Sequence, residues 1–156
     1  MQGFADGTVS IFDERLSGSS NGRALTARAD TGSWIVAGYT RHDLPQVITA
    51  AIKGTVRFWD IRTMRVYKTL EVFKHPLTAL AVHRCLPIMA TGSHAQIIKI
   101  FTMGGDQLGN DIKYHDGFLG QRIGPISCLA FHPYKLMLAA GATDNIVSIY
   151  APPDAV

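Results

Sequence analysis

Four short segments of the chain share one pattern of apolar and polar positions. In each, aliphatic or β-branched positions alternate with a more polar position, and the segment ends on an aromatic residue. Alternation with a period of two predicts a β-strand with one buried face. The segments are 8–12, 55–59, 97–101 and 146–150, and their last residues are Phe12, Trp59, Phe101 and Tyr150. We expect these four aromatic side chains to be structural anchors of the fold.

The spacing of the four anchors predicts the kind of fold. Consecutive anchors are 47, 42 and 49 residues apart. A repeat of about 40–50 residues, with an aromatic residue at the end of a strand, is typical of a β-propeller blade. The second copy ends in Trp59 and Asp60, the dipeptide that names the WD repeat. Propellers of this kind mostly hold other proteins, so the repeat favours a scaffolding role.

Further columns of equivalent residues support the repeat. Two-residue hairpins are expected at 6–7, 53–54, 95–96 and 144–145, because Asp-Gly is a strong signal for a type I′ turn. A small residue lies three positions before the first residue of each expected hairpin, and it allows close approach of strands. These small residues are Gly3, Ala50, Gly92 and Gly141. The inner strands are expected at 34–39, 77–83 and 126–132. The outer strands are expected at 24–28, 66–73 and 107–114.

These elements predict an all-β fold, a partial WD40-type β-propeller of about three and a half four-stranded antiparallel blades. We expect a partial blade over residues 1–30, full blades over 31–74 and 75–117, and a final three-stranded blade over 123–150. Propellers close with about four to eight blades, and fewer leave unpaired strand edges. The pattern therefore predicts that residues 1–156 are the C-terminal part of a larger propeller, which would supply the remaining blades.

Composition excludes several classes of function. The net charge is +3, and the fifteen basic residues are spread along the chain without aromatic residues between them, so we expect no nucleic-acid binding. No apolar run reaches the roughly 18 residues that a membrane span needs, and no signal peptide is visible. Cys85 and Cys128 lie in or beside strand patterns and are expected to be reduced thiols in the core. We therefore expect a cytoplasmic protein without membrane insertion.

Candidate catalytic or metal-binding residues do not form a pattern. The six histidines show no metal-ligand spacing on one element, and no cysteine accompanies them. His83 and His132 are equivalent in the repeat, each at the end of an inner strand, and we expect both to bond to the backbone of a turn. No serine lies in a nucleophile elbow, and no glycine-rich loop precedes a helix. We expect no enzyme activity, no cofactor and no metal.

One connection is a candidate binding site. The segment 114–124 is long for a joint between blades and carries aromatic, aliphatic and charged residues. Apolar residues on a loop above a rigid scaffold can contact a partner. The alternative is that Phe118 and Leu119 pack between blades as a latch. The candidate partner-binding residues are Asp116, Phe118, Leu119, Gln121 and Arg122.

Two stretches carry a resemblance to a known family. Residues 110–122, which read Asn-Asp-Ile-Lys-Tyr-His-Asp-Gly-Phe-Leu-Gly-Gln-Arg, continue through the inner strand 126–133 and resemble the last blades of the raptor family. Residues 5–13 resemble its penultimate blades. Raptors are regulatory-associated proteins of the target-of-rapamycin (TOR) kinase. The resemblance covers essentially the whole chain.

The resemblance implies a non-enzymatic scaffold of TOR complex one that takes part in nutrient and growth signalling. Family members have a caspase-like N-terminal domain, a helical-repeat middle and a seven-bladed C-terminal propeller. The implied partners are components and substrates of the TOR kinase complex, although the family's principal substrate-docking surface lies in the parts that this chain lacks. A generic WD-repeat adaptor, such as a ubiquitin-ligase substrate receptor, is the alternative. The chain also departs from the ideal WD repeat, since only one of the four copies has a true Trp-Asp.

Overall fold

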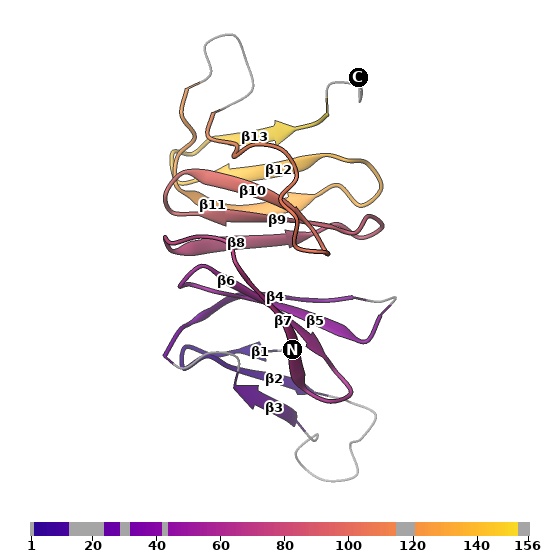
Figure 1. Cartoon of the computed structure of the whole chain (residues 1–156). Coiled ribbons are helices and arrows are strands. Elements are labelled where there is room, and N and C mark those ends of the chain that lie inside the picture. Colours follow the sequence, from indigo (N-terminus) through magenta and orange to yellow (C-terminus); the bar gives the residue numbers. More distant parts are fainter. Residues whose placement is uncertain (1, 13–23, 29–31, 42–43, 115–120, 153–156) are drawn as a thin grey trace. The chain divides into compact units, whose positions relative to one another are not determined.

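The fold consists of β-strands joined by turns (Figure 1). The structure is a computed structural model, and it describes residues 2–12, 24–28, 32–41, 44–114 and 121–152. Within these residues there are thirteen strands and no helix. The strands form four antiparallel sheets of three or four strands, which confirms the predicted all-β, blade-like organisation.

The chain divides into two compact units, Met1–Glu71 and Val72–Val156. The first unit contains two sheets, in each of which the strands follow one another in sequence order. The three-stranded sheet consists of β1 (Gln2–Gly3), β2 (Thr8–Phe12) and β3 (Ala24–Arg28). The four-stranded sheet consists of β4 (Ile35–Thr40), β5 (Gln46–Ala51), β6 (Thr55–Asp60) and β7 (Arg65–Glu71).

The second unit contains two three-stranded sheets. One consists of β8 (Leu77–Val82), β9 (Ile88–Ser93) and β10 (Ile97–Thr102), and the other of β11 (Ile126–Phe131), β12 (Leu138–Ala142) and β13 (Val147–Tyr150). The fourth strand expected at 107–114 is replaced by isolated bridges, Phe101 to Gln107 and Ile98 to Ile112. Between them, Gly109 has a φ of 69°, which interrupts an extended strand.

The turns lie where the sequence predicts them, but their type differs from the prediction. Only the second residue of each expected pair has a positive φ: Gly7 (82°), Gly54 (94°), Gln96 (66°) and Asn145 (63°). The Gly54 amide donates to the Ala51 carbonyl at 3.0 Å. This geometry is a type I turn followed by one left-handed residue, whereas type I′ would need two.

An aspartate closes the first of these turns. The Asp6 carboxylate accepts bonds from the Thr8 hydroxyl at 2.7 Å and the Thr8 amide at 2.9 Å. These two bonds hold the pKa of the exposed Asp6 carboxyl below its ordinary value. Asp144 repeats the bond in the last sheet, where it accepts from the Ile146 amide at 3.1 Å. Asp6 and Asp144 therefore cap equivalent turns of the first and the last sheet.

Two members of the column of small residues, Gly3 and Gly92, lie beneath the inner strand of the next sheet. A Cβ added to Gly3 in β1 would stand 2.7 Å from the Ile35 side chain in β4. One added to Gly92 in β9 would stand 2.5 Å from the side chain of Ile126 in β11. Real Cβ atoms do not approach so closely, so only glycine permits these contacts. The predicted close approach at Gly3 and Gly92 is confirmed.

The anchor aromatic residues occupy different environments. Trp59 is buried among residues of both sheets of the first unit, including Val9 and Val47, and its indole N–H donates to the Thr49 hydroxyl at 2.9 Å. Phe101 is also buried, with 8% of its surface exposed. Tyr150 is half-buried against the core of the second unit. Phe12 is 51% exposed, so it is the least buried of the four anchor residues.

A buried apolar cluster joins the two sheets of the second unit. It is formed by Ala79, Ala90, Ile98, Ile123, Ile126, Leu138 and Ala140. The Thr78 hydroxyl adds a polar link, because it donates to the Ile126 carbonyl at 2.6 Å and so joins β8 to β11. The small alanines of β8, β9 and β12 let the isoleucines of the facing sheet approach the backbone.

Two equivalent histidines organise equivalent turns. The Nδ1 atom of His83 accepts the amides of Cys85 (3.1 Å) and Leu86 (2.9 Å). The Nδ1 atom of His132 accepts the amides of Tyr134 (3.2 Å) and Lys135 (2.9 Å). Because Nδ1 accepts in both cases, these partners assign the imidazole proton to Nε2. The predicted backbone-bonding role of both histidines is confirmed.

The two histidines differ in burial. His83 is only 3% exposed, and its Nε2 atom lies 3.2 Å from the carbonyl of Lys135, in the turn that His132 closes. Its ring also lies edge-on to Phe131, with 5.4 Å between ring centroids. His132 is exposed to solvent. His83 therefore connects the two turns, whereas His132 acts within its own.

We expect Gly92→Ala to lower the free energy of unfolding by about 1–3 kcal/mol, because the new methyl group forces Ile126 away from β9. Gly104→Ala is the control: a Cβ there would lie 3.1 Å or more from two side chains of an exposed turn. Urea unfolding of the two variants and the parent chain makes the comparison. Equal midpoints for all three proteins would contradict the close-packing interpretation.

We expect His83→Ala to lower the free energy of unfolding by about 1–3 kcal/mol, because two amides and a carbonyl lose a partner beside a buried ring. His132→Ala removes the same pair of amide bonds, but water can replace them, so its cost is smaller, about 0.5–1.5 kcal/mol. Thermal and urea unfolding measure both. An equal loss in the two variants would show that His83 does not connect the turns.

Candidate protein-binding site

The candidate connection predicted from the sequence is described only at its ends. Asp116, Phe118 and Leu119 lie outside the described residues, whereas Gln121 and Arg122 are described and exposed. Tyr114 and Arg122 form an antiparallel bridge, and the Ile123 amide donates to the Lys113 carbonyl at 3.1 Å. The two ends of the connection therefore lie side by side, and the role of its residues remains a prediction.

The connection is fastened to the last sheet immediately after its second end. Ile123 is buried in the core of the second unit, with 1% of its surface exposed. The Gly124 amide donates to the Asp144 carboxylate at 3.0 Å. A Cβ at Gly124 would stand 2.7 Å from that carboxylate, so glycine is needed here. The connection consequently starts and ends on a rigid base.

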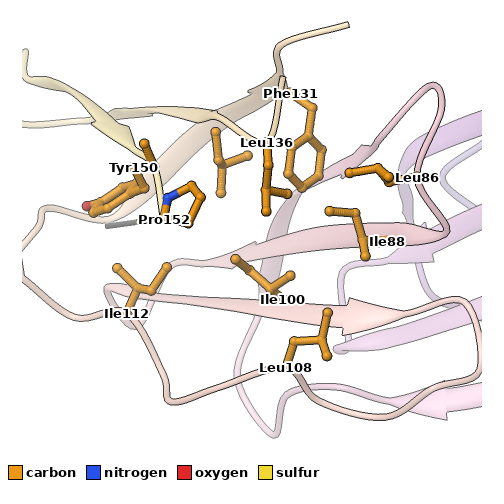
Figure 2. A pocket seen from close by; sticks show the side chains of 11 residues that line it. Leu86, Ile88, Ile100, Leu108, Ile112, Phe131, Leu136, Tyr150 and Pro152 are labelled. Carbon is orange, nitrogen blue, oxygen red and sulfur yellow. The ribbon is translucent and has the colours of Figure 1, made fainter. Parts of the chain in front are cut away.

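A second candidate site is an apolar pocket in the second unit (Figure 2). Its volume is about 450 Å³, within the range of pockets that hold ligands or partner side chains. It is lined by Leu86, Ile88, Ile100, Leu108, Ile112, Phe131, Leu136, Leu138, Tyr150, Ala151 and Pro152. None of these side chains carries a charge, so the pocket is suited to apolar groups.

The irregular chain that follows β10 forms one wall of the pocket through Leu108 and Ile112. The other walls of the pocket include Ile88 and Ile100 from one sheet and Phe131 and Leu138 from the other. In place of a regular outer strand, single bonds hold the next segment: the Leu108 amide donates to the Ile100 carbonyl at 2.8 Å.

Leucines from turns stand at the opening of the pocket. Leu86, Leu108 and Leu136 are 40%, 42% and 44% exposed, although each also lines the pocket. Leu86 belongs to the turn closed by His83, and Leu136 directly follows the turn closed by His132. The histidine bonds thus hold two of the three leucines in place.

The two candidate sites offer an apolar pocket and a long connection, both of which can contact a partner. Among the described residues, no three His, Cys, Asp or Glu side chains gather where they could hold a metal ion. Cys85 and Cys128 are free and exposed, so the expectation that they are core thiols is wrong. Both lie near the surface because Cys85 follows β8 in a turn and Cys128 occupies an outward position of β11. A search of the described residues found no helix long and apolar enough to span a bilayer.

Sequence reasoning missed the apolar pocket. Its residues come from turns and strands of two repeats, and each of those residues fits an ordinary strand or turn pattern when it is considered alone. The repeated histidines were the available signal, since they mark the turns that carry Leu86 and precede Leu136. The loss of the outer strand at 107–114 could have been suspected from Gly104, Gly105 and Gly109.

Comparison with known proteins finds a matching domain model and relatives of the raptor type. The model of the WD domain, G-beta repeat, matches residues 118–150. The chain is 43% identical over 152 residues to Regulatory-associated protein of TOR 1 of Arabidopsis thaliana, covering 95% of this chain and 11% of the relative. It is 39% identical over 150 residues to the raptor homologue of Dictyostelium discoideum, covering 95% of this chain and 10% of the relative.

A solved structure agrees with these relatives. The crystal structure of Chaetomium thermophilum Raptor superposes with a TM-score of 0.82 at 29% identity, covering 97% of this chain and 14% of that one. The chain therefore spans about a tenth of the length of the curated relatives it matches. In sequence and in fold, the chain is similar to a WD-repeat segment of raptor proteins.

Proposed function

We propose that this chain is a non-enzymatic scaffold segment that mediates protein–protein contacts in a TOR complex and so takes part in nutrient and growth signalling. Its relatives include a Regulatory-associated protein of TOR 1 and, at 33% identity, the Target of rapamycin complex 1 subunit mip1 of Schizosaccharomyces pombe. The first name describes a protein associated with TOR, and the second describes a subunit of a TOR complex. We propose the same kind of association for this chain.

The apolar pocket of the second unit is the observation that carries the proposal. Its eleven lining residues include no ionisable group other than the hydroxyl of Tyr150. An enzyme site needs polar groups placed against the reacting atoms, whereas a protein-binding site needs an apolar centre that excludes water. The composition of the pocket supports binding.

The proposed partners are components of a TOR complex and further blades of a longer protein. β13 pairs with β12 alone among the described strands, and its Val147 and Ile149 are 70% and 60% exposed. An exposed apolar edge strand can form backbone hydrogen bonds with a strand of another chain or segment. We propose that an additional strand or sheet covers it. We also propose a cytoplasmic location, which the free thiols of Cys85 and Cys128 support.

A segment exchange tests the proposed function. This chain replaces the matching segment of Regulatory-associated protein of TOR 1 of Arabidopsis, and the tagged chimaera is expressed in plants that lack the native protein. We expect co-purification with TOR at a level close to that of the parent, and fluorescence of the tag in the cytoplasm. The control is the same protein with the segment deleted, in which co-purification should fall severalfold.

Two results would oppose the proposal. One is a chimaera that is stable and abundant but does not co-purify with TOR. The other is a deletion variant that is stable and co-purifies as well as the parent, since the segment would then contribute no contact. A fluorescence signal confined to another compartment would oppose the proposed location alone.

A further inference from the structure

The two turns that carry or precede leucines of the apolar pocket also carry exposed side chains typical of protein interfaces. Tyr134 is 74% exposed, and it stands in the turn that also holds Lys135 and leads to Leu136. The equivalent turn holds Arg84 and leads to Leu86. Tyrosine, arginine and large apolar residues are enriched in the energetically dominant parts of interfaces.

The two turns are held in place before any partner arrives. Each is closed by a histidine Nδ1 atom that accepts two amides. The Nε2 atom of His83 bonds the Lys135 carbonyl, and the Cys85 thiol donates to the Pro133 carbonyl at 3.5 Å. A surface that is already ordered loses little conformational entropy on binding, which favours affinity.

The charges of these two turns indicate the chemistry of the partner. Arg84 and Lys135 are both exposed, and neither of their turns contains a carboxylate. The nearby turn before Leu108 contributes Asp106, whose carboxylate is engaged by the Thr102 hydroxyl at 3.4 Å. The two turns therefore present positive charge next to an apolar pocket, which complements a carboxylate next to an apolar side chain.

We propose that this pocket binds an extended peptide segment of a partner protein through one aliphatic or aromatic side chain, with an adjacent Asp or Glu held by Arg84 and Lys135. The proposal rests on the proposed scaffold function and names the chemistry of one of its partners. The apolar side chain enters between Leu86, Leu108 and Leu136. The peptide carboxylate remains at the rim, where a basic side chain can reach it without being buried.

A random-peptide display library, selected on the complete 156-residue chain, provides the probe. We expect the enriched peptides to share a Leu, Ile, Met or Phe with an Asp or Glu directly beside it. The best peptide is then synthesised, and its affinity is measured by fluorescence anisotropy. Leu136→Glu should weaken binding by about tenfold or more, since it places a charge at an apolar contact.

Matched variants separate the pocket from other surfaces. Leu44→Glu makes the same change at a residue of the first unit that is 42% exposed, and it should leave affinity unchanged. Arg84→Glu combined with Lys135→Glu should weaken binding and reduce its dependence on salt, whereas Arg65→Glu in exposed β7 should not. Unfolding curves of all variants are compared. If Leu136→Glu is unstable, Tyr134→Ala and Leu86→Ser replace it, because both residues are exposed.

Several outcomes would overturn the inference. They are a library without enrichment, peptides that lack the apolar anchor or carry basic neighbours, and affinity that is unchanged in the pocket variants. Failure of the selected peptide to bind the full-length chimaera would show that another part of the longer protein occupies the pocket. A chimaera that still co-purifies with TOR in any of these cases would leave the proposed function intact and refute only the peptide site.

Discussion

The close approach of neighbouring sheets at glycine is the constraint on which the rest of the structure depends. In the second unit, the Ile126 side chain lies where a Cβ of residue 92 would otherwise stand. That contact lets the Thr78 hydroxyl reach the Ile126 carbonyl and lets the alanines of three strands pack beneath isoleucine. Gly3 and Ile35 repeat the arrangement in the first unit. Without these contacts, stacked sheets would not share a continuous apolar core.

The pocket follows from tight packing at the inner strands combined with irregular packing farther out. Sheets that meet closely at β9 and β11 need regular outer strands to fill the space beyond them. After β10, the chain makes only isolated bridges, so leucine and isoleucine side chains line a space of about 450 Å³. The equivalent bonds of His83 and His132 hold the turns at its opening, and the burial of His83 ties one turn to the other.

This architecture is suited to holding proteins. Its described residues offer an exposed edge on β13, an apolar pocket and a long connection whose second end is fastened to the last sheet. Its relatives include a protein named as associated with TOR and one named as a subunit of a TOR complex. Surfaces of this kind can hold other proteins, which is the role proposed for this segment.

The sequence by itself determined the repeat, the strands and the turn positions, because alternation, small-residue columns and turn chemistry act over a few residues. It also determined the backbone bonds of His83 and His132, which reach only two and three residues along the chain. It did not determine that Phe12 is exposed while Trp59 is buried, or that both cysteines are at the surface. The turn type, the loss of an outer strand and the pocket were likewise decided by the tertiary structure. Each of these features depends on which residues of another strand or sheet pack against a given position. The local sequence pattern does not specify those packing partners.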